Sequence, residues 1–153
     1  MQHIALSFFD KDLCRPFFDR LTDLFHEHHH SEAQDSEGYE NLLYRVHRPY
    51  SPEMLDMIDD WMGLEKRSWR EETQREVLLS LYAIKYPDTL LIESLTDKAR
   101  ADIRRLSAYL HFSHHTYSIW DEDTRKGLSK LGISIPSIDY ADPFVYGAYV
   151  SSI

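Results

Sequence analysis

The sequence contains one cysteine, five glycines and no apolar run long enough to cross a bilayer. Because Cys14 stands alone, no disulfide can form within the chain, and a reducing cytoplasm is the expected compartment. Five glycines leave little material for the glycine-rich loops that bind phosphate, so a nucleotide-using enzyme is disfavoured. The N-terminus also lacks the basic stretch that opens a secretion signal. These absences indicate a soluble cytoplasmic protein without a membrane partner.

Basic residues are in deficit as well, with 17 Lys and Arg against 26 Asp and Glu, and a net charge of −9. Residues 1–40 hold nine acidic residues against only Lys11, Arg15 and Arg20. Neutralising phosphates requires an excess of Lys and Arg, so direct nucleic-acid binding is disfavoured. An acidic surface instead suits a basic protein partner.

The apolar residues that are present recur mainly at helical spacing. They make up 42% of the 153 residues, which is enough for one folded domain. Ser51 and Pro52 mark the start of a helix that Gly63 should end, and residues 68–71 match a capping box. Residues 39–48 fit either a helix or a strand, and we favour a helix that ends before Pro49. We therefore expect a mainly α, single-domain bundle of about five to seven helices over residues 1–153.

The longest helix is expected from about Thr96 to Trp120, followed by a short one that starts at Asp121 or Asp123 and ends at Gly132.

Residues 132–153 differ in composition from the preceding residues, because prolines interrupt a run rich in aromatic side chains. We expect an extended C-terminal segment, either lying across the bundle or pairing with residues 2–8 as a small two-stranded element. Its aromatic residues are Tyr140, Phe144, Tyr146 and Tyr149. They suit either closure of the core or an interface between subunits of a homo-oligomer.

Seven of the nine histidines fall in two clusters: His26, His28, His29 and His30, then His111, His114 and His115. His26 and His30 are spaced i, i+4, as are His111 and His115, so each pair shares one helix face. If the two faces met, four imidazoles would suit zinc or another divalent metal. If they do not meet, the histidines are solvated helix surface.

The second histidine cluster follows an arginine pair. Arg104 and Arg105 precede His111 by the four to six intervening residues that HEPN-type ribonucleases place between an arginine and a histidine. The chain resembles those helical-bundle enzymes in this one helix, although their arginine is usually followed by a small polar residue. The resemblance implies a ribonuclease centred on Arg104, His111 and His115, with metal assistance through His26 and His30.

The charge pattern favours a different function, a small acidic protein-binding module with no favoured catalytic residue. The expected class is an inhibitor, of the immunity, antitoxin or phage anti-defence kind, that acts on a basic or nucleic-acid-handling protein. A helical hydrolase and an oligomeric structural subunit are the alternatives. The candidate partner contacts are Asp19, Asp23, Glu27, Asp59, Asp60, Asp121, Glu122 and Asp123.

Overall fold

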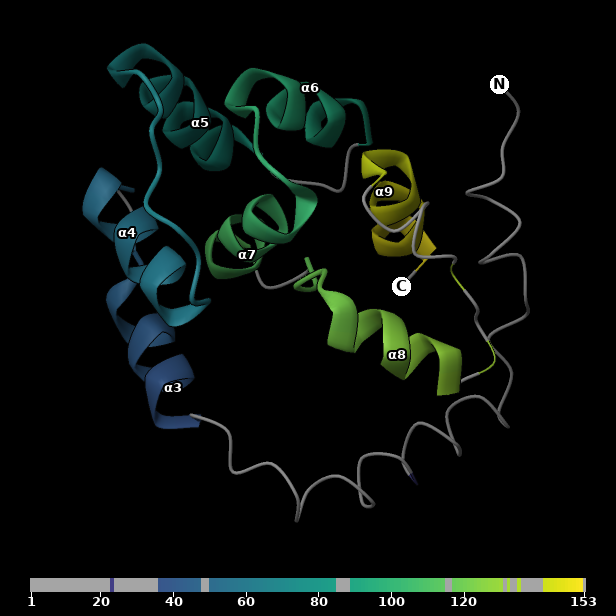
Figure 1. Ribbon diagram of the computed structural model, residues 1–153. Coiled ribbons are helices and arrows are strands. Elements are labelled where there is room, and N and C mark those ends of the chain that lie inside the picture. Colours follow the sequence, from purple (N-terminus) through teal and green to yellow (C-terminus); the bar gives the residue numbers. More distant parts are fainter. Residues whose placement is uncertain are drawn as a thin grey trace.

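The fold is mainly α, as the spacing of apolar residues predicts. The computed structural model describes residues 23, 36–47, 50–84, 89–114, 117–130, 132, 135 and 142–152. Within these residues there are seven helices and no strands. They are α3 (Ser36–Arg45), α4 (Pro52–Trp61), α5 (Glu71–Ala83), α6 (Thr89–Ala99), α7 (Ile103–Ser113), α8 (Glu122–Lys130) and α9 (Pro143–Ser152) (Figure 1).

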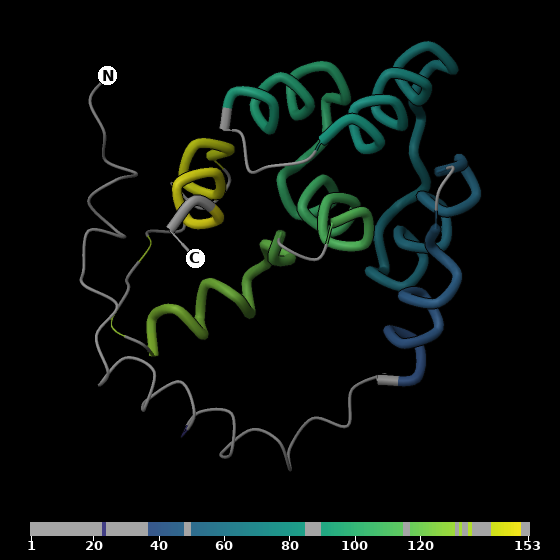
Figure 2. The backbone as a smooth tube through the Cα atoms, turned by 180° about the vertical axis from the view of Figure 1, so that it is seen from behind, coloured from purple at the N-terminus to yellow at the C-terminus, as the bar shows by residue number. Residues whose placement is uncertain are grey.

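Helix α7 is the centre of the bundle. Figures 1 and 2 view the molecule from opposite sides, and in both α7 lies among α4, α5 and α6. Seven of its eleven residues are buried, among them Leu106, Tyr109 and Leu110. A helix that buries residues on most of its circumference must be covered by several neighbours, which explains the arrangement. None of the described helices is both long and apolar enough to span a membrane.

Helix α4 begins and ends where its sequence signals predict. Ser51 is the extended residue before the helix, and Pro52 occupies its first turn. At the other end Gly63 has φ +64°, and the amide of Leu64 donates to the carbonyl of Asp59 at 2.9 Å. Glycine tolerates this left-handed conformation, which lets the chain leave the helix with its last carbonyls bonded.

The expected long helix over residues 96–120 is wrong, because the chain breaks between α6 and α7. Helix α6 ends at Ala99, and Arg100 then adopts the left-handed region with φ +45°. The carboxylate of Asp102 accepts a hydrogen bond from the amide of Arg105 at 2.9 Å, which caps the start of α7. An aspartate that bonds the amide three residues ahead favours a new helix start over continuation of the old one.

The expected capping box at Ser68 does not start a helix. Helix α5 begins at Glu71, and the residue before it, Arg70, makes no side-chain cap. The side chain of Arg67 is only 4% exposed, because it reaches into the interior of the bundle. This anchor holds residues 64–70 as a connecting segment between α4 and α5.

The C-terminal segment is helical rather than extended over residues 143–152, so that expectation is wrong there. Tyr146 of α9 is fully buried, with its ring 5.7 Å from that of Trp120, and its hydroxyl donates to the carbonyl of Ser118 at 2.9 Å. The ring of Tyr149 lies 5.0 Å from the same Trp120. These aromatic residues therefore close the core. Residues 2–8, their predicted strand partner, lie outside the described part.

The helices predicted at residues 39–48 and after Asp121 are both present, as α3 and α8. Asp121 caps α8, because its Oδ1 accepts from the amide of Thr124 at 2.8 Å. Gly132, with φ +85°, follows the end of that helix, as predicted.

Candidate functional site

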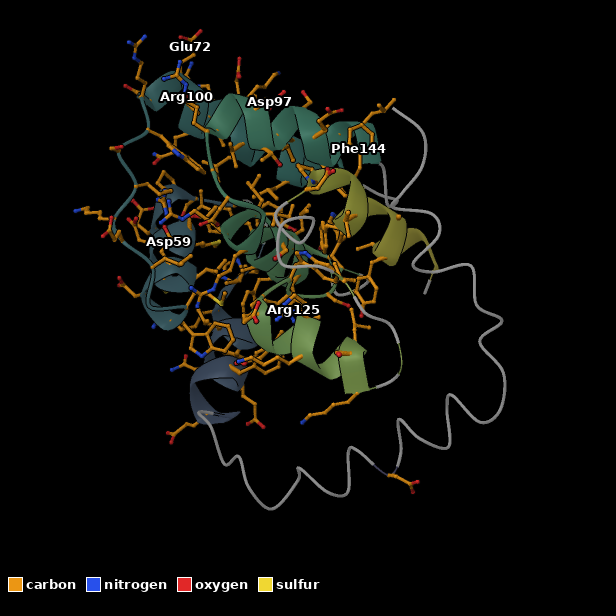
Figure 3. All side chains as sticks on the ribbon, turned by 45° about the vertical axis from the view of Figure 1, so that its right-hand side comes forward. Asp59, Glu72, Asp97, Arg100, Arg125 and Phe144 are labelled. Carbon is orange, nitrogen blue, oxygen red and sulfur yellow. The ribbon has the colours of Figure 1, made fainter. Side chains whose placement is uncertain are left out.

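A group of charged side chains lies inside the bundle, where α4, α7 and the 64–70 segment meet. We call Asp59, Arg67, Arg105 and Tyr109 the Asp59 cluster. Asp59, labelled in Figure 3, is only 3% exposed. It accepts hydrogen bonds from the Tyr109 hydroxyl at 2.6 Å and from Arg67 Nη1 at 2.5 Å. Arg105 Nε lies 3.2 Å from the same carboxylate. Two guanidinium groups and a phenol thus compensate a buried negative charge, as its desolvation requires.

Arg67 connects this cluster to the surrounding chain. Its Nη2 donates to the carboxylate of Asp56 at 2.8 Å and to the carbonyl of Pro52 at 3.2 Å. Its guanidinium also lies over the rings of Trp69 and Tyr109, 5.6 and 6.0 Å from their centroids. Arg67 therefore fixes its own segment against both α4 and α7.

The protonation states of the cluster do not suit acid–base chemistry near neutral pH. Burial raises the pKa of Tyr109 far above its ordinary value, and the hydrogen bond to Asp59 raises it further. Burial opposes the charge of Arg67, but the interactions with Tyr109 and Asp59 outweigh it, so the pKa of Arg67 is also raised. Tyr109 and Arg67 therefore both keep their protons across the neutral range.

The neighbouring carboxylates Asp59 and Asp60, both predicted as partner contacts, have opposite environments. Asp60 is exposed, whereas Asp59 belongs to the buried cluster and is not on the surface where a partner would bind. One residue along a helix turns the side chain by about 100°, which is enough to separate core from solvent. Asp59 also follows Leu55 by four residues, so the apolar stripe of α4 already indicated its inward position.

The predicted contacts on α8 are exposed or half-buried but already interact within the chain. Glu122 accepts hydrogen bonds from Arg125, which lower the pKa of its carboxyl, and Asp123 lies 3.3 Å from Lys126. Such exposed pairs are worth little energy, so they remain open to exchange with a partner. The other predicted contacts are Asp23, which is exposed, and Asp19 and Glu27, which lie outside the described residues.

An acidic surface on α3 and α4 was only partly predicted, through Asp60. These adjacent helices carry six carboxylates, of which Asp59 is buried and Asp56 pairs with Arg67, and the only basic residue within their bounds is Arg45. Tyr44 is 88% exposed, the highest value among the exposed large hydrophobic side chains of the described part. We define the acidic surface as the exposed residues Glu37, Glu40 and Tyr44 of α3 with Glu53 and Asp60 of α4.

Three of these carboxylates have features that sequence reasoning missed. Glu37 and Glu40 are separated by one helix turn, so they share a face with Tyr44. A hydrogen bond with Ser51 lowers the pKa of Glu53, so this carboxylate is ionised at neutral pH. The helical spacing of Glu37, Glu40 and Tyr44 was the available signal.

Within the described residues, no three His, Cys, Asp or Glu side chains lie close enough together to bind a metal. His111 Nδ1 lies 2.7 Å from the carbonyl of Tyr117, and its Nε2 lies 2.8 Å from the hydroxyl of Tyr39. The carbonyl requires the proton on Nδ1, so Nε2 accepts from the tyrosine, and both ring nitrogens are occupied. His26, His30 and His115, the other predicted ligands, lie outside the described residues.

The arginine and histidine of the ribonuclease resemblance are held by different neighbours. Arg104 is exposed and donates from Nη2 to the carbonyl of Met62 at 3.0 Å, at the end of α4. His111 is two helix turns further along α7, a rise of about 10 Å, and contacts α3 through Tyr39. The structure does not bring these two side chains together.

No protein-family model matches this chain, and no curated protein and no solved structure is significantly similar to it.

Proposed function

We propose that this protein is a cytoplasmic inhibitor that binds a basic, nucleic-acid-handling protein through the acidic surface of α3 and α4. The observation that supports the proposal is the combination of exposed carboxylates with the 88% exposed ring of Tyr44. Carboxylates attract a basic partner over distance, and an exposed tyrosine supplies the apolar contact that anchors an interface.

The mechanism is competition with nucleic acid. Glu37 and Glu40 lie one turn apart on α3, and Glu53 and Asp60 lie two turns apart on α4. Two rows of negative charge on adjacent helices can occupy basic side chains that otherwise contact phosphates. The partner then loses its nucleic acid without any chemical reaction.

A pair of matched variants tests the proposal. The test variant combines Glu37→Gln, Glu40→Gln and Glu53→Gln, and the control combines Glu71→Gln, Glu72→Gln and Asp97→Asn on α5 and α6. All six residues are exposed, and both variants remove three negative charges. Proteins cross-linked from a lysate of the source organism are compared among the three forms, and each candidate partner is then purified.

We expect a basic partner that the wild type and the control bind with similar Kd, whereas the test variant binds about tenfold more weakly. Added salt should weaken wild-type binding, and the wild type should displace a labelled oligonucleotide from the partner. Equal binding by the test variant, or equal loss in the control, would refute the assignment to this surface.

A further inference from the structure

A pocket of about 820 Å³ opens where the 63–70 segment, α5, the end of α6 and the start of α7 meet. Its size lies in the range of small-molecule sites, which is roughly 300–1,000 Å³. The basic side chains in its lining are Lys66, Arg70, Lys98, Arg100 and Arg105. The lining carboxylates are Glu65 and Asp102, so positive charge is in excess here although the chain carries −9 overall.

Three of these cations are not compensated by the described part of the chain. Arg105 lies against Asp59, and Lys98 Nζ lies 3.8 Å from Glu76. By contrast, Lys66, Arg70 and Arg100 make no ion pair with any residue that the structure describes. Cations that share one pocket repel one another, and a bound anion offsets this repulsion.

The backbone at Arg100 adds an independent observation. Arg100 follows α6 with φ +45°, and the amides of Arg100 and Ala101 bond back to the last turn of that helix at 3.3 Å. Glycine is the residue that usually fills this position, as Gly63 does after α4. An arginine here has a less favourable backbone, but its guanidinium lines the pocket. Figure 3 shows Arg100 at the end of α6, beside α5.

We propose that this pocket binds a small ligand carrying two or more phosphate groups, such as a nucleoside triphosphate. Guanidinium and ammonium groups are the side chains that bind phosphate most strongly, and three uncompensated ones suit an oligophosphate rather than a single anion. Trp69 also lines the pocket, and because the Arg67 guanidinium lies over its ring and the Tyr109 ring meets it edge to face, only the part of the indole that faces the pocket is left for a base. With only five glycines in the chain, this mode of phosphate binding relies on side chains rather than on a main-chain loop.

The rim of the pocket favours a small ligand over a nucleic acid. Glu72 and Asp97, both labelled in Figure 3, are exposed and directly precede the lining residues Thr73 and Lys98 in the chain. Their negative charges repel a long phosphate backbone that would have to pass over them, whereas a ligand inside the pocket meets mainly the cations. The acidic surface of α3 and α4 does not contribute to this lining, so the inference is independent of the function proposed above.

Calorimetric titration of the full chain with tripolyphosphate and with ATP, at low ionic strength, tests the inference. We expect saturable binding of one ligand per chain with both compounds. Tighter binding of ATP would assign a nucleotide through Trp69, and equal affinities would assign the oligophosphate chain alone. No heat with either compound at millimolar concentration would overturn the inference.

Matched charge variants show whether binding occurs in the pocket. The test variant is Lys66→Gln with Arg70→Gln, and the control is Arg45→Gln with Arg75→Gln, which are exposed cations outside the pocket. Each pocket cation removed should weaken binding by about tenfold, whereas the control should stay within about twofold. Equal weakening in the control would show that the weaker binding comes from the change in net charge, and it would overturn the inference.

Two further measurements test whether the variant is still folded and whether the ligand is a small molecule. Arg70 makes no side-chain cap and Lys66 is exposed, so circular dichroism should show an intact fold in the test variant. A short single-stranded oligonucleotide serves as the competing ligand. If it bound more tightly than ATP and lost affinity in the same test variant, the small-ligand assignment would be wrong.

Discussion

Replacing Asp59 with alanine should destabilise the protein more than any other removal of a single charge. The change leaves the guanidinium of Arg67, whose side chain is 4% exposed, without its partner at 2.5 Å. It also removes the acceptor of the fully buried Tyr109 hydroxyl. Breaking a buried ion pair on one side typically lowers the free energy of unfolding by about 3–5 kcal/mol. Because Arg67 keeps Asp56 at 2.8 Å, we expect about 3 kcal/mol, at the lower end of that range.

The assay is urea unfolding at neutral pH, followed by fluorescence of the three tryptophans and by circular dichroism. Asp60→Ala is the matched control, because it removes the same charge from the neighbouring exposed position and should change stability by less than about 0.5 kcal/mol. A loss below about 1 kcal/mol for Asp59→Ala would refute the reasoning, since it would mean that the buried charges do not depend on one another.

A second variant separates lost pairing from lost packing. Combining Asp59→Leu with Arg67→Met removes both charges and fills the space with apolar atoms, and such replacements are often close to neutral. We expect the double variant to recover at least half of the stability lost in Asp59→Ala. A double variant as unstable as the sum of its single changes would show that the two residues are not coupled.

Arg100→Gly should raise the free energy of unfolding by about 1 kcal/mol while weakening tripolyphosphate binding, and Gly63→Ala should lower it by a similar amount. Burial raises the pKa values of Tyr109 and Tyr146. Their contribution to the free energy of unfolding is therefore fully present below pH 10, and above pH 10 it falls by about 1.4 kcal/mol per pH unit for each tyrosine. Urea unfolding between pH 9 and 11 should therefore show a slope that Tyr146→Phe halves. His111→Ala should cost about 2 kcal/mol of stability, measured by urea unfolding, because both ring nitrogens are bonded; an unchanged midpoint would contradict this.

The sequence predicted those features whose causes are local. Ser51, Pro52 and Gly63 set the ends of α4 through the backbone next to them, and the structure confirms both ends. The break after Ala99 was missed because the apolar spacing continues across it, from Ala99 to Ile103 and onward. A pattern of every third or fourth residue does not distinguish one helix from two that present the same face to the core.

The Asp59 cluster and the pocket were missed for a different reason. Arg67 lies eight residues from Asp59 and Tyr109 lies fifty residues from it, and only packing of α7 against α4 brings them together. The lining cations at positions 66 and 100 likewise meet only because α5 and α6 fold back on each other. No local spacing encodes such contacts, although the position of Asp59 on the apolar stripe of α4 was a usable signal.

Net charge is a poor guide to this molecule, because its charges are separated in space. The value of −9 led to the expectation of an acidic binding surface, and it equally led to the expectation that nucleic acid is not bound directly. The first conclusion requires only that carboxylates gather somewhere, as they do on α3 and α4. The second conclusion would require that basic side chains are grouped nowhere on the molecule. The net charge, which is summed over the whole chain, does not establish this. Arg105 shows how close the buried Asp59 cluster lies to the cationic pocket, because its Nε meets Asp59 while the residue also lines the pocket. Binding at the acidic surface or in the pocket would therefore depend on the charge of that place rather than on the sum over the chain, and each needs its own matched variants.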